Sequence, residues 1–254
     1  MNNPYFKQTW WDTTIKEKES GFLYGIGKSD AISKIFSRQY VKSKGYRSII
    51  DLGCGPATEF FAYKDEGYEI NYLGIDSSQY LFKINLERGV PMLLSRAESV
   101  HLPQNSYEIV YSRHVLEHQP FFEPILEEMI RLAEKEATHV FFFKPGENPK
   151  FSHFNEEENL WHSTYNKKEI ENFLEQHPKV DFFFWEDVPL PENGLADGFT
   201  PEVMLHIIMK KAKLDHEIIC NEPKRFTIEN EITGKKITFF LDPGDILKLE
   251  SFNF

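Results

Sequence analysis

The sequence IIDLGCGPATE, residues 49–59, decides the fold. An apolar run typical of a buried strand leads into Gly53 and Gly55, and the residues after them suit the start of a helix. Glycines allow the backbone to approach a ligand closely, and a helix N-terminus presents free N–H groups and the positive end of its dipole. The stretch therefore predicts a binding loop for a nucleotide-like cofactor.

Four more apolar runs follow, separated from one another by segments with helical spacing. The five expected strands are 48–52, 70–75, 91–94, 107–111 and 138–143, and the expected helices among them are 58–66, 79–88 and 121–135. Alternation of this kind is typical of β/α units on a parallel sheet. Further on, 167–176 suits a helix, and 180–185 and 203–209 suit two strands that pair with each other. The sequence therefore predicts an α/β fold.

Asp76 is expected at the end of the second strand, 23 residues after Gly53. An acidic side chain at this place can accept hydrogen bonds from ribose hydroxyls. A nicotinamide or flavin dinucleotide could use the same loop, but the fingerprint G-x-G-x-x-G is not met because its third glycine is missing. The missing glycine favours a different nucleotide-like cofactor.

The motifs resemble those of the class I S-adenosylmethionine-dependent methyltransferases. The matching residues are Asp51-Leu-Gly-Cys-Gly55, Gly74-Ile75-Asp76, Ala97-Glu98, Leu102-Pro103, Tyr107–Val110 and Leu116-Glu117-His118. They occur in the expected order and cover about residues 45–211. The resemblance implies a Rossmann-like, seven-stranded, mostly parallel sheet with helices on both faces, and S-adenosylmethionine bound across the carboxyl ends of the strands.

The same resemblance implies which residues contact the cofactor. Asp51, Gly53, Cys54 and Gly55 would surround the methionine part, and Asp76 with Ser77 would hold the ribose. Arg96, Ala97 and Glu98 would flank the adenine, and Ser112, Arg113 and His114 would lie near the sulfonium and its methyl group. Many members carry an Asp where this chain has Arg96, so the usual contact to the adenine amino group is in doubt.

Methyl transfer is an in-line displacement that needs an oriented acceptor, and a hydroxyl acceptor also needs a base. His114 is the first candidate for the catalytic base, and His118 is the second. The resemblance places Trp161, His162 and Tyr165 before a helix where related proteins line the acceptor pocket, and His153 lies in the same loop, 145–166. A packing or surface role is the rival explanation for each of these residues.

Three other classes of function are open. His114-Val-Leu-Glu-His118 spells H-x-x-E-H, a zinc-hydrolase pattern that puts two histidines on one helical face, although it leaves the glycine loop unexplained. An NAD-dependent oxidoreductase would bind its cofactor at the same glycines. A catalytically silent subunit would bind S-adenosylmethionine and transfer nothing.

Two regions flank the expected domain at 45–211. Residues 1–44 are rich in aromatics and suit a helical cap over a pocket, in which Tyr24, beside Gly25 and Gly27, could close over the cofactor carboxylate. Residues 212–254 contain short strand-like runs at 226–229, 236–241 and 246–252. This β-rich extension could be a lid, a homodimer contact or a small sheet of its own.

The composition limits the partners. The chain has 254 residues, a net charge of -11 and no long run of Lys or Arg, which disfavours nucleic acid. With only two cysteines, no signal-peptide pattern and no apolar stretch long enough for a membrane span, a cytoplasmic protein without a membrane partner or bound metal is expected. The sequence therefore predicts a small-molecule methyltransferase, acting on a hydroxyl oxygen of a sugar or another metabolite.

Overall fold

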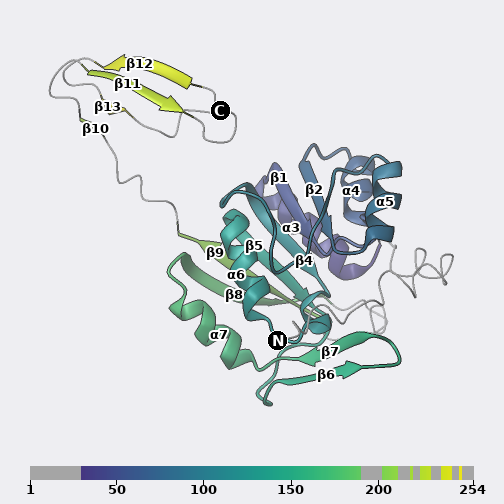
Figure 1. The fold of residues 1–254 in the computed structure, drawn as a ribbon. Coiled ribbons are helices and arrows are strands. Elements are labelled where there is room, and N and C mark those ends of the chain that lie inside the picture. The colour runs from purple at the N-terminus through teal and green to yellow at the C-terminus, as the bar shows by residue number, and fades with distance from the viewer. Residues whose placement is uncertain are drawn as a thin grey trace. The chain divides into compact units, whose positions relative to one another are not determined.

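The computed structural model describes residues 30–189 and 202–210, and the backbone of four short strands between 218 and 247. The chain divides into two compact units, Met1–Lys210 and Lys211–Phe254. The first unit contains α3 (Ile32–Lys44), β1 (Ser48–Leu52), α4 (Thr58–Asp65), β2 (Asn71–Asp76), α5 (Gln79–Glu87), β3 (Met92–Leu94), β4 (Tyr107–Arg113), the 3-10 helix η2 (Leu116–His118), α6 (Glu123–Leu132), β5 (Ala133–Phe141), β6 (Phe151–Asn155), β7 (Leu160–Thr164), α7 (Lys167–Gln176), β8 (Val180–Asp187) and β9 (Val203–Met209). Figure 1 shows their arrangement.

Seven strands form one sheet in the order β3-β2-β1-β4-β5-β9-β8. The first five are parallel, and β9 lies antiparallel to both β5 and β8. The expected α/β fold with a seven-stranded, mostly parallel sheet is confirmed, as is the pairing of 180–185 with 203–209. Because β1, β2 and β4 are parallel, their carboxyl ends meet at one edge of the sheet, where ligands of such folds bind.

Helices cover both faces of the sheet, and consecutive residues of β1 show how. Ile49 belongs to the core cluster under α3 and α4, whereas Ile50 belongs to the cluster under α6 and α7. Both side chains are fully buried. Side chains of a strand alternate between the two faces, so a strand buried on both sides needs an unbroken apolar run. This requirement explains why residues 48–52 are predicted with the bounds that the structure gives.

The helix before β5 is shorter than the expected range 121–135. It ends at Leu132, and β5 begins at once with Ala133. The backbone amides of Asn105 and Ser106 bond to the carbonyls of Arg131 and Leu132, so the helix ends against this loop. The charged run 134–136 favoured a helix, but Glu136 is fully buried in the strand by partners that lie far away in the sequence.

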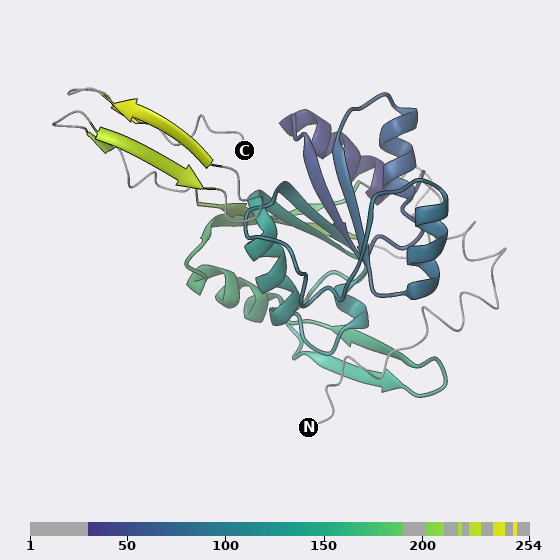
Figure 2. The same cartoon turned by 45° about the horizontal axis from the view of Figure 1, so that its top comes forward.

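Residues 145–166, expected as a polar loop, contain the antiparallel hairpin of β6 and β7. The hairpin follows the carboxyl end of β5 (Figures 1 and 2), and β7 lies against η2. Its turn is held by the side chain of Asn155, which accepts hydrogen bonds from the amides of Glu157 and Glu158. The hairpin thus lies beside the edge where β4 ends.

The second unit contains two pairs of antiparallel strands. β10 (Ile218–Ile219) pairs with β13 (Ile246–Leu247), and β11 (Lys224–Glu229) pairs with β12 (Lys236–Leu241). The expected short strands of the C-terminal extension are therefore present, with an added strand at 218–219. In the described part of the chain, no helix is long and apolar enough to cross a membrane.

Candidate cofactor-binding site

The glycine loop follows β1 and turns sharply towards α4. Gly53 and Gly55 have φ of +74° and +55°, in the left-handed region that side chains disfavour. A Cβ on Gly53 would also lie 2.3 Å from Cγ2 of Val115, so neither the backbone nor the space there accepts another residue. A Cβ on Gly55 would meet no heavy atom within 4 Å. The loop therefore has open space beside Gly55, where a ligand could approach the backbone.

Asp76 at the end of β2 fixes the conformation of this loop. Its Oδ2 accepts a hydrogen bond from the amide of Gly55 at 2.9 Å, and its Oδ1 accepts one from the amide of Ser78 at 2.9 Å. Ser78 in turn caps α5 by accepting from the amide of Leu81 at 3.2 Å. A carboxylate can accept about four hydrogen bonds, so an acid that holds the loop can also accept from ribose hydroxyls.

Asp51 is directed away from the loop and into the neighbouring strand. Its Oδ2 accepts a hydrogen bond from the hydroxyl of Tyr72 at 2.7 Å, and both side chains are buried. Burial raises the pKa of Asp51 to about 7, and the Tyr72 hydroxyl opposes that rise. The carboxylate of Asp51 therefore lies within the sheet, at the base of the glycine loop.

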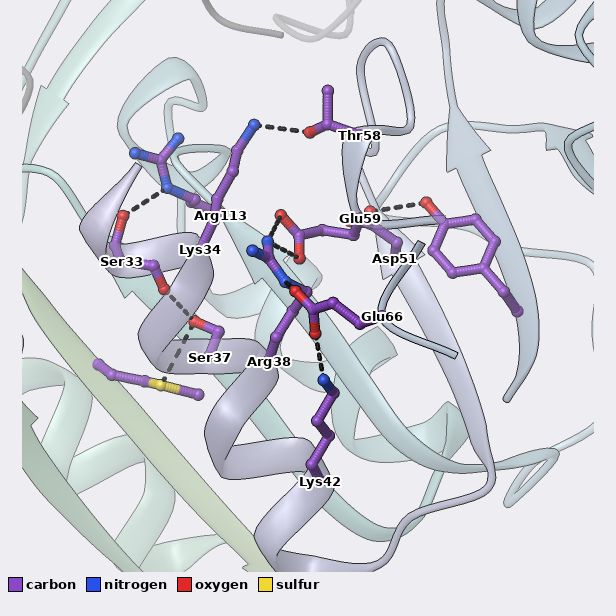
Figure 3. Close-up of polar contacts among 12 residues, drawn as sticks. Ser33, Lys34, Ser37, Arg38, Lys42, Asp51, Thr58, Glu59, Glu66 and Arg113 are labelled. Atoms are coloured by element: carbon purple, nitrogen blue, oxygen red, sulfur yellow. Dashed lines mark hydrogen bonds and ion pairs between the residues drawn. The ribbon is translucent and has the colours of Figure 1, made fainter. Parts of the chain in front are cut away.

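A cluster of cations surrounds the start of α4 (Figure 3). The buried Lys34 of α3 donates from Nζ to Oγ1 of Thr58 at 2.7 Å, and burial lowers its pKa to about 8. Arg38, one turn later, pairs with Glu59 at 3.1 Å and with Glu66 at 2.9 Å. Lys34 thus brings a positive charge to the helix that follows the glycine loop.

The carboxyl end of β4 carries Ser112, Arg113 and His114. Ser112 is fully buried, and Arg113 donates from Nε to Oγ of Ser33 at 2.8 Å. His114 has a φ of +57°, which is unusual for a residue with a side chain, and its amide donates to the carbonyl of Val140 at 2.9 Å. Burial and then Arg113 lower the pKa of His114 well below its ordinary value, so the ring is neutral at physiological pH.

Glu202, which immediately precedes β9, reaches the same place. Its Oε1 lies 2.5 Å from Nε2 of His114 and 3.2 Å from Nη2 of Arg113, and it accepts from Oγ of Ser33 at 3.0 Å. Sequence reasoning missed Glu202, Ser33 and Lys34. The only signals were a lone acid ahead of an apolar run and a Lys34–Arg38 pair at helical spacing.

His118 lies in a second group, between η2 and β7. Burial lowers its pKa, and its Nδ1 donates to the carbonyl of Trp161 at 3.1 Å, because a carbonyl can only accept. The proton of this neutral ring is therefore on Nδ1, and Nε2 carries the lone pair. The rings of His118 and His162 are 6.0 Å apart, and the ring of Phe142 lies between the two groups, 5.1 Å from His114 and 5.7 Å from His118.

The remaining candidates occupy different surroundings. His153 and His162 face each other across the hairpin on its exposed side, and His162 also pairs with Glu158 at 2.6 Å. Tyr165 is buried, and its hydroxyl donates to the carbonyls of Leu116 and Gln119, so it anchors η2.

The adenine candidates follow β3. Arg96 pairs with Glu98 at 2.5 Å, and Ala97 packs against the core. Cys54 is buried with a raised pKa, and Ser77 is exposed between Asp76 and the cap residue Ser78. Tyr24 and the rest of residues 1–29 lie outside the described residues.

The geometry that a zinc hydrolase would need is not formed. Only residues 116–118 are helical here, and they form a single 3-10 turn, so His114 and His118 do not share a helical face. Glu117 is buried and accepts from the amide of Phe142 at 2.8 Å. Among the described residues, no three His, Cys, Asp or Glu side chains are grouped so that they could hold a metal ion.

Comparisons with known proteins agree with this geometry. Residues 50–141 match the family model described as "Methyltransferase domain". A curated relative, phosphoethanolamine N-methyltransferase 1 of Arabidopsis thaliana, is 31% identical over 118 residues, which cover 41% of this chain and 24% of the relative. The chain thus spans about a quarter of the length of the curated relative that it matches.

Two solved structures share the fold. The 1,6-didemethyltoxoflavin-N1-methyltransferase of Burkholderia thailandensis, with bound 1,6-didemethyltoxoflavin and S-adenosylhomocysteine, has a TM-score of 0.54 at 14% identity, over 83% of this chain and 92% of that one. The magnesium protoporphyrin IX methyltransferase of Synechocystis, with bound S-adenosylhomocysteine, has a TM-score of 0.57 at 9% identity, over 82% and 99%.

Residues 50–141 thus match a methyltransferase domain, and the sheet order and the glycine loop are those expected of the class I S-adenosylmethionine-dependent methyltransferases. S-adenosylmethionine is the cofactor of this class. The match therefore favours S-adenosylmethionine over a dinucleotide at the glycine loop.

Proposed function

We propose that the protein transfers the methyl group of S-adenosylmethionine to a small-molecule acceptor, and that the accepting atom is a hydroxyl oxygen. One observation carries the proposal: two partly buried, neutral histidines, His114 and His118, follow β4 at the edge that holds the glycine loop. A hydroxyl must lose its proton as the new bond forms, and a neutral imidazole is the side chain suited to take it.

Each part of the cofactor has suitable residues at this edge of the sheet. The carboxylate of Asp76 would accept from the ribose hydroxyls, and the open space beside Gly55 would admit the methionine part. Lys34 contacts the first residue of α4, Thr58, and would attract the cofactor carboxylate. Ala97, between Arg96 and Glu98, would contact the adenine through its backbone. When bound, S-adenosylmethionine supplies an electrophilic methyl group, and the residues of the chain orient the acceptor and receive its proton.

The acceptor side of the site would be built from His118, Trp161 and His162. These residues place polar atoms and aromatic surface at the hairpin next to η2. Aromatic walls with polar tips suit sugars and planar metabolites. Tyr165 would hold η2 in place beside these residues. His153 would lie next to them on the exposed face of the hairpin.

A second candidate is an amine nitrogen. The curated relative matched over 118 residues is named as a phosphoethanolamine N-methyltransferase. An ammonium group must also lose a proton before it can accept a methyl group, so the same neutral histidines would serve that reaction.

The test has two stages. Calorimetric titration of the full chain should give saturable binding of S-adenosylmethionine and none of NAD. Methyl-labelled S-adenosylmethionine is then offered with matched alcohols and amines, and the labelled product is identified by mass spectrometry. His114→Ala should bind the cofactor as the parent does and turn over more slowly. If the protein binds S-adenosylmethionine but labels no acceptor, it is the catalytically silent subunit. If the His114→Ala variant is fully active, His114 is not the base.

A further inference from the structure

Glu202 is brought to the cofactor edge by the reversal of one strand. Because β9 runs antiparallel to β5, its first residue, Val203, pairs with the last residue of β5, Phe141. The residue just before β9 therefore lies at the carboxyl ends of the parallel strands, although it is 88 residues away from His114 in the sequence. Its side chain is 1% exposed.

A single oxygen of Glu202 receives three donors from two separate segments. Ser33 comes from α3, and Arg113 and His114 come from the end of β4. Arg113 also donates from Nε to Oγ of Ser33 at 2.8 Å, which closes the network around Oε1. The other oxygen, Oε2, is buried and has no hydrogen-bond partner among the described residues. A buried polar atom of this kind is commonly satisfied by water or by a ligand.

The partners of Oε1 decide which atom carries the proton between Glu202 and His114. Arginine stays charged, and the hydroxyl of Ser33 donates, so Oε1 is an acceptor towards both. Burial raises the pKa of Glu202, and the charge of Arg113 and the hydroxyl of Ser33 oppose that rise, which favours the ionised carboxylate. Nε2 of His114 must then be the donor across their 2.5 Å contact. Since the ring is neutral, Nδ1 is left with the lone pair.

The backbone of His114 gives an independent reason to assign a function to this contact. A residue with a side chain is strained at a φ of +57° and stays there only when its surroundings hold it. Here the amide of His114 bonds to the carbonyl of Val140, and the ring bonds to Glu202. Strain of this kind gathers at sites where a side chain must be aimed.

We propose that Glu202 is a positioning residue that fixes the tautomer and the orientation of His114, so that Nδ1 is the nitrogen that takes the proton of the acceptor. This proposal rests on the proposed function of His114. It differs from that function because the tautomer can be measured without any acceptor. Glu202 thus has the role of the carboxylate behind a catalytic histidine, as in hydrolase triads.

The first test uses the unmodified protein. Nitrogen NMR of the full chain with labelled histidine, assigned by comparison with His114→Gln, reports which ring nitrogen of His114 carries the proton. The expected result is a proton on Nε2. A neutral His114 with its proton on Nδ1 would overturn the proposal whatever the protein methylates. If no acceptor is ever found, the proposed function fails, and this measurement still decides the role of Glu202.

The second test is Glu202→Gln. The glutamine amide can donate to Nε2 and would favour the other tautomer, so kcat should fall about 100-fold, while affinity for S-adenosylhomocysteine stays near that of the parent. The pH profile of kcat should also change, because Glu202 acts on His114 together with Arg113, Glu117, His118 and His139. Glu202→Asp, which keeps the charge, should recover part of the rate.

Glu127→Gln is the matched control, because Glu127 pairs with His177 at 3.1 Å at the end of α7. This variant should have the parent's kcat and pH profile. A folded Glu202→Gln protein with the parent's kcat and pH profile would contradict the proposal. If Glu202→Gln does not fold, the tautomer of the unmodified protein gives the answer.

Discussion

The carboxylate of Asp76 accepts a hydrogen bond from the backbone amide of Gly55 at 2.9 Å. The end of β2 therefore holds the loop that follows β1, and this contact joins two parts of the candidate cofactor site. Sequence spacing placed an acid at this strand end, but it assigned the acid to ribose alone. The structure adds a second partner, which lies in the protein itself.

Asp76→Ala should weaken S-adenosylhomocysteine binding about 10- to 100-fold, because the ribose loses an acceptor and the loop loses its anchor. Asp76→Asn, which keeps one acceptor oxygen, should be less affected. Calorimetric titration measures both affinities, and Asp65→Ala, at an exposed position on α4, is the control. An unchanged affinity in a folded Asp76→Ala protein would exclude the ribose assignment.

Replacing the two glycines should have different consequences. Gly53→Ala combines a positive φ with a Cβ that would lie 2.3 Å from Val115, so the free energy of unfolding should fall by about 3 kcal/mol. Adding Val115→Ala should restore part of this loss. Gly55→Ala, with open space around its Cβ, should cost only about 1 kcal/mol.

Cofactor affinity separates the two positions further. The methyl group of Gly55→Ala would enter the space that we assign to the methionine part, so binding of S-adenosylhomocysteine should be lost from a folded protein. Urea unfolding and calorimetric titration provide the two readouts. A Gly55→Ala protein with the parent's affinity would show that the cofactor does not occupy that space.

Asp51 should make stability depend on pH. Its pKa is about 7 in the folded protein and 3.8 ordinarily, so the folded state keeps a proton that the unfolded chain releases. The stabilisation is complete below pH of about 4 and is lost as the pH rises through about 7. Asp51→Asn keeps an acceptor for Tyr72 and cannot ionise, so at pH 8 it should be more stable than the parent by on the order of 3 kcal/mol.

At pH 5 the gain of Asp51→Asn over its parent should be smaller, on the order of 1–2 kcal/mol, because only the unfolded chain is ionised there. Urea unfolding at both pH values measures this difference, and Asp65→Asn should show no pH-dependent gain. Equal stability of parent and Asp51→Asn at pH 8 would mean that Asp51 ionises in the folded protein at its ordinary pKa.

The Glu136 cluster should contribute strongly to stability. The hydroxyls of Tyr40 and Tyr46 and Nδ1 of His206 all donate to its fully buried carboxylate, at 2.9, 2.6 and 2.8 Å. Removing the carboxylate leaves three donors without their acceptor, two of them on buried residues, so Glu136→Ala should lower the free energy of unfolding by about 3–5 kcal/mol. Glu134→Ala, at an exposed position two residues earlier, should change it little.

Glu136 lies in the first half of β5, five residues before the carboxyl end of that strand at Phe141. Glu136→Ala should therefore keep its affinity for S-adenosylhomocysteine at temperatures where it is folded. A loss of affinity in the folded protein would indicate that the cluster also holds the site.

Sequence alone predicts the parts of the fold that depend on local pattern. An apolar run followed by glycines, as in β1 and its loop, is typical of few other structures. The position of Asp76 follows from the length of the second strand. The end of α6 and the hairpin of β6 and β7 were missed, since charges such as Glu136 and the polar residues 145–166 indicate other structures when read locally.

Within the site, sequence reasoning found the residues next to the strand ends and missed the residues that act on them. Lys34 and Ser33 belong to a helix before the sheet, and Glu202 belongs to the strand that enters it late. Their contacts depend on how α3 and β9 pack, and no periodicity or spacing encodes a contact between residues that are 88 positions apart.

The antiparallel strand β9 also determines when the site is completed. The matched family region ends at residue 141, and β1, β2, β4 and β5 all lie within or beside it. A ribosome making this chain therefore releases the glycine loop and its anchor Asp76 well before Glu202. In the interval, His114 has been synthesised and its carboxylate partner, Glu202, has not. Glu202 therefore joins the glycine loop and Asp76 only after all the strands from β1 to β8 have been made.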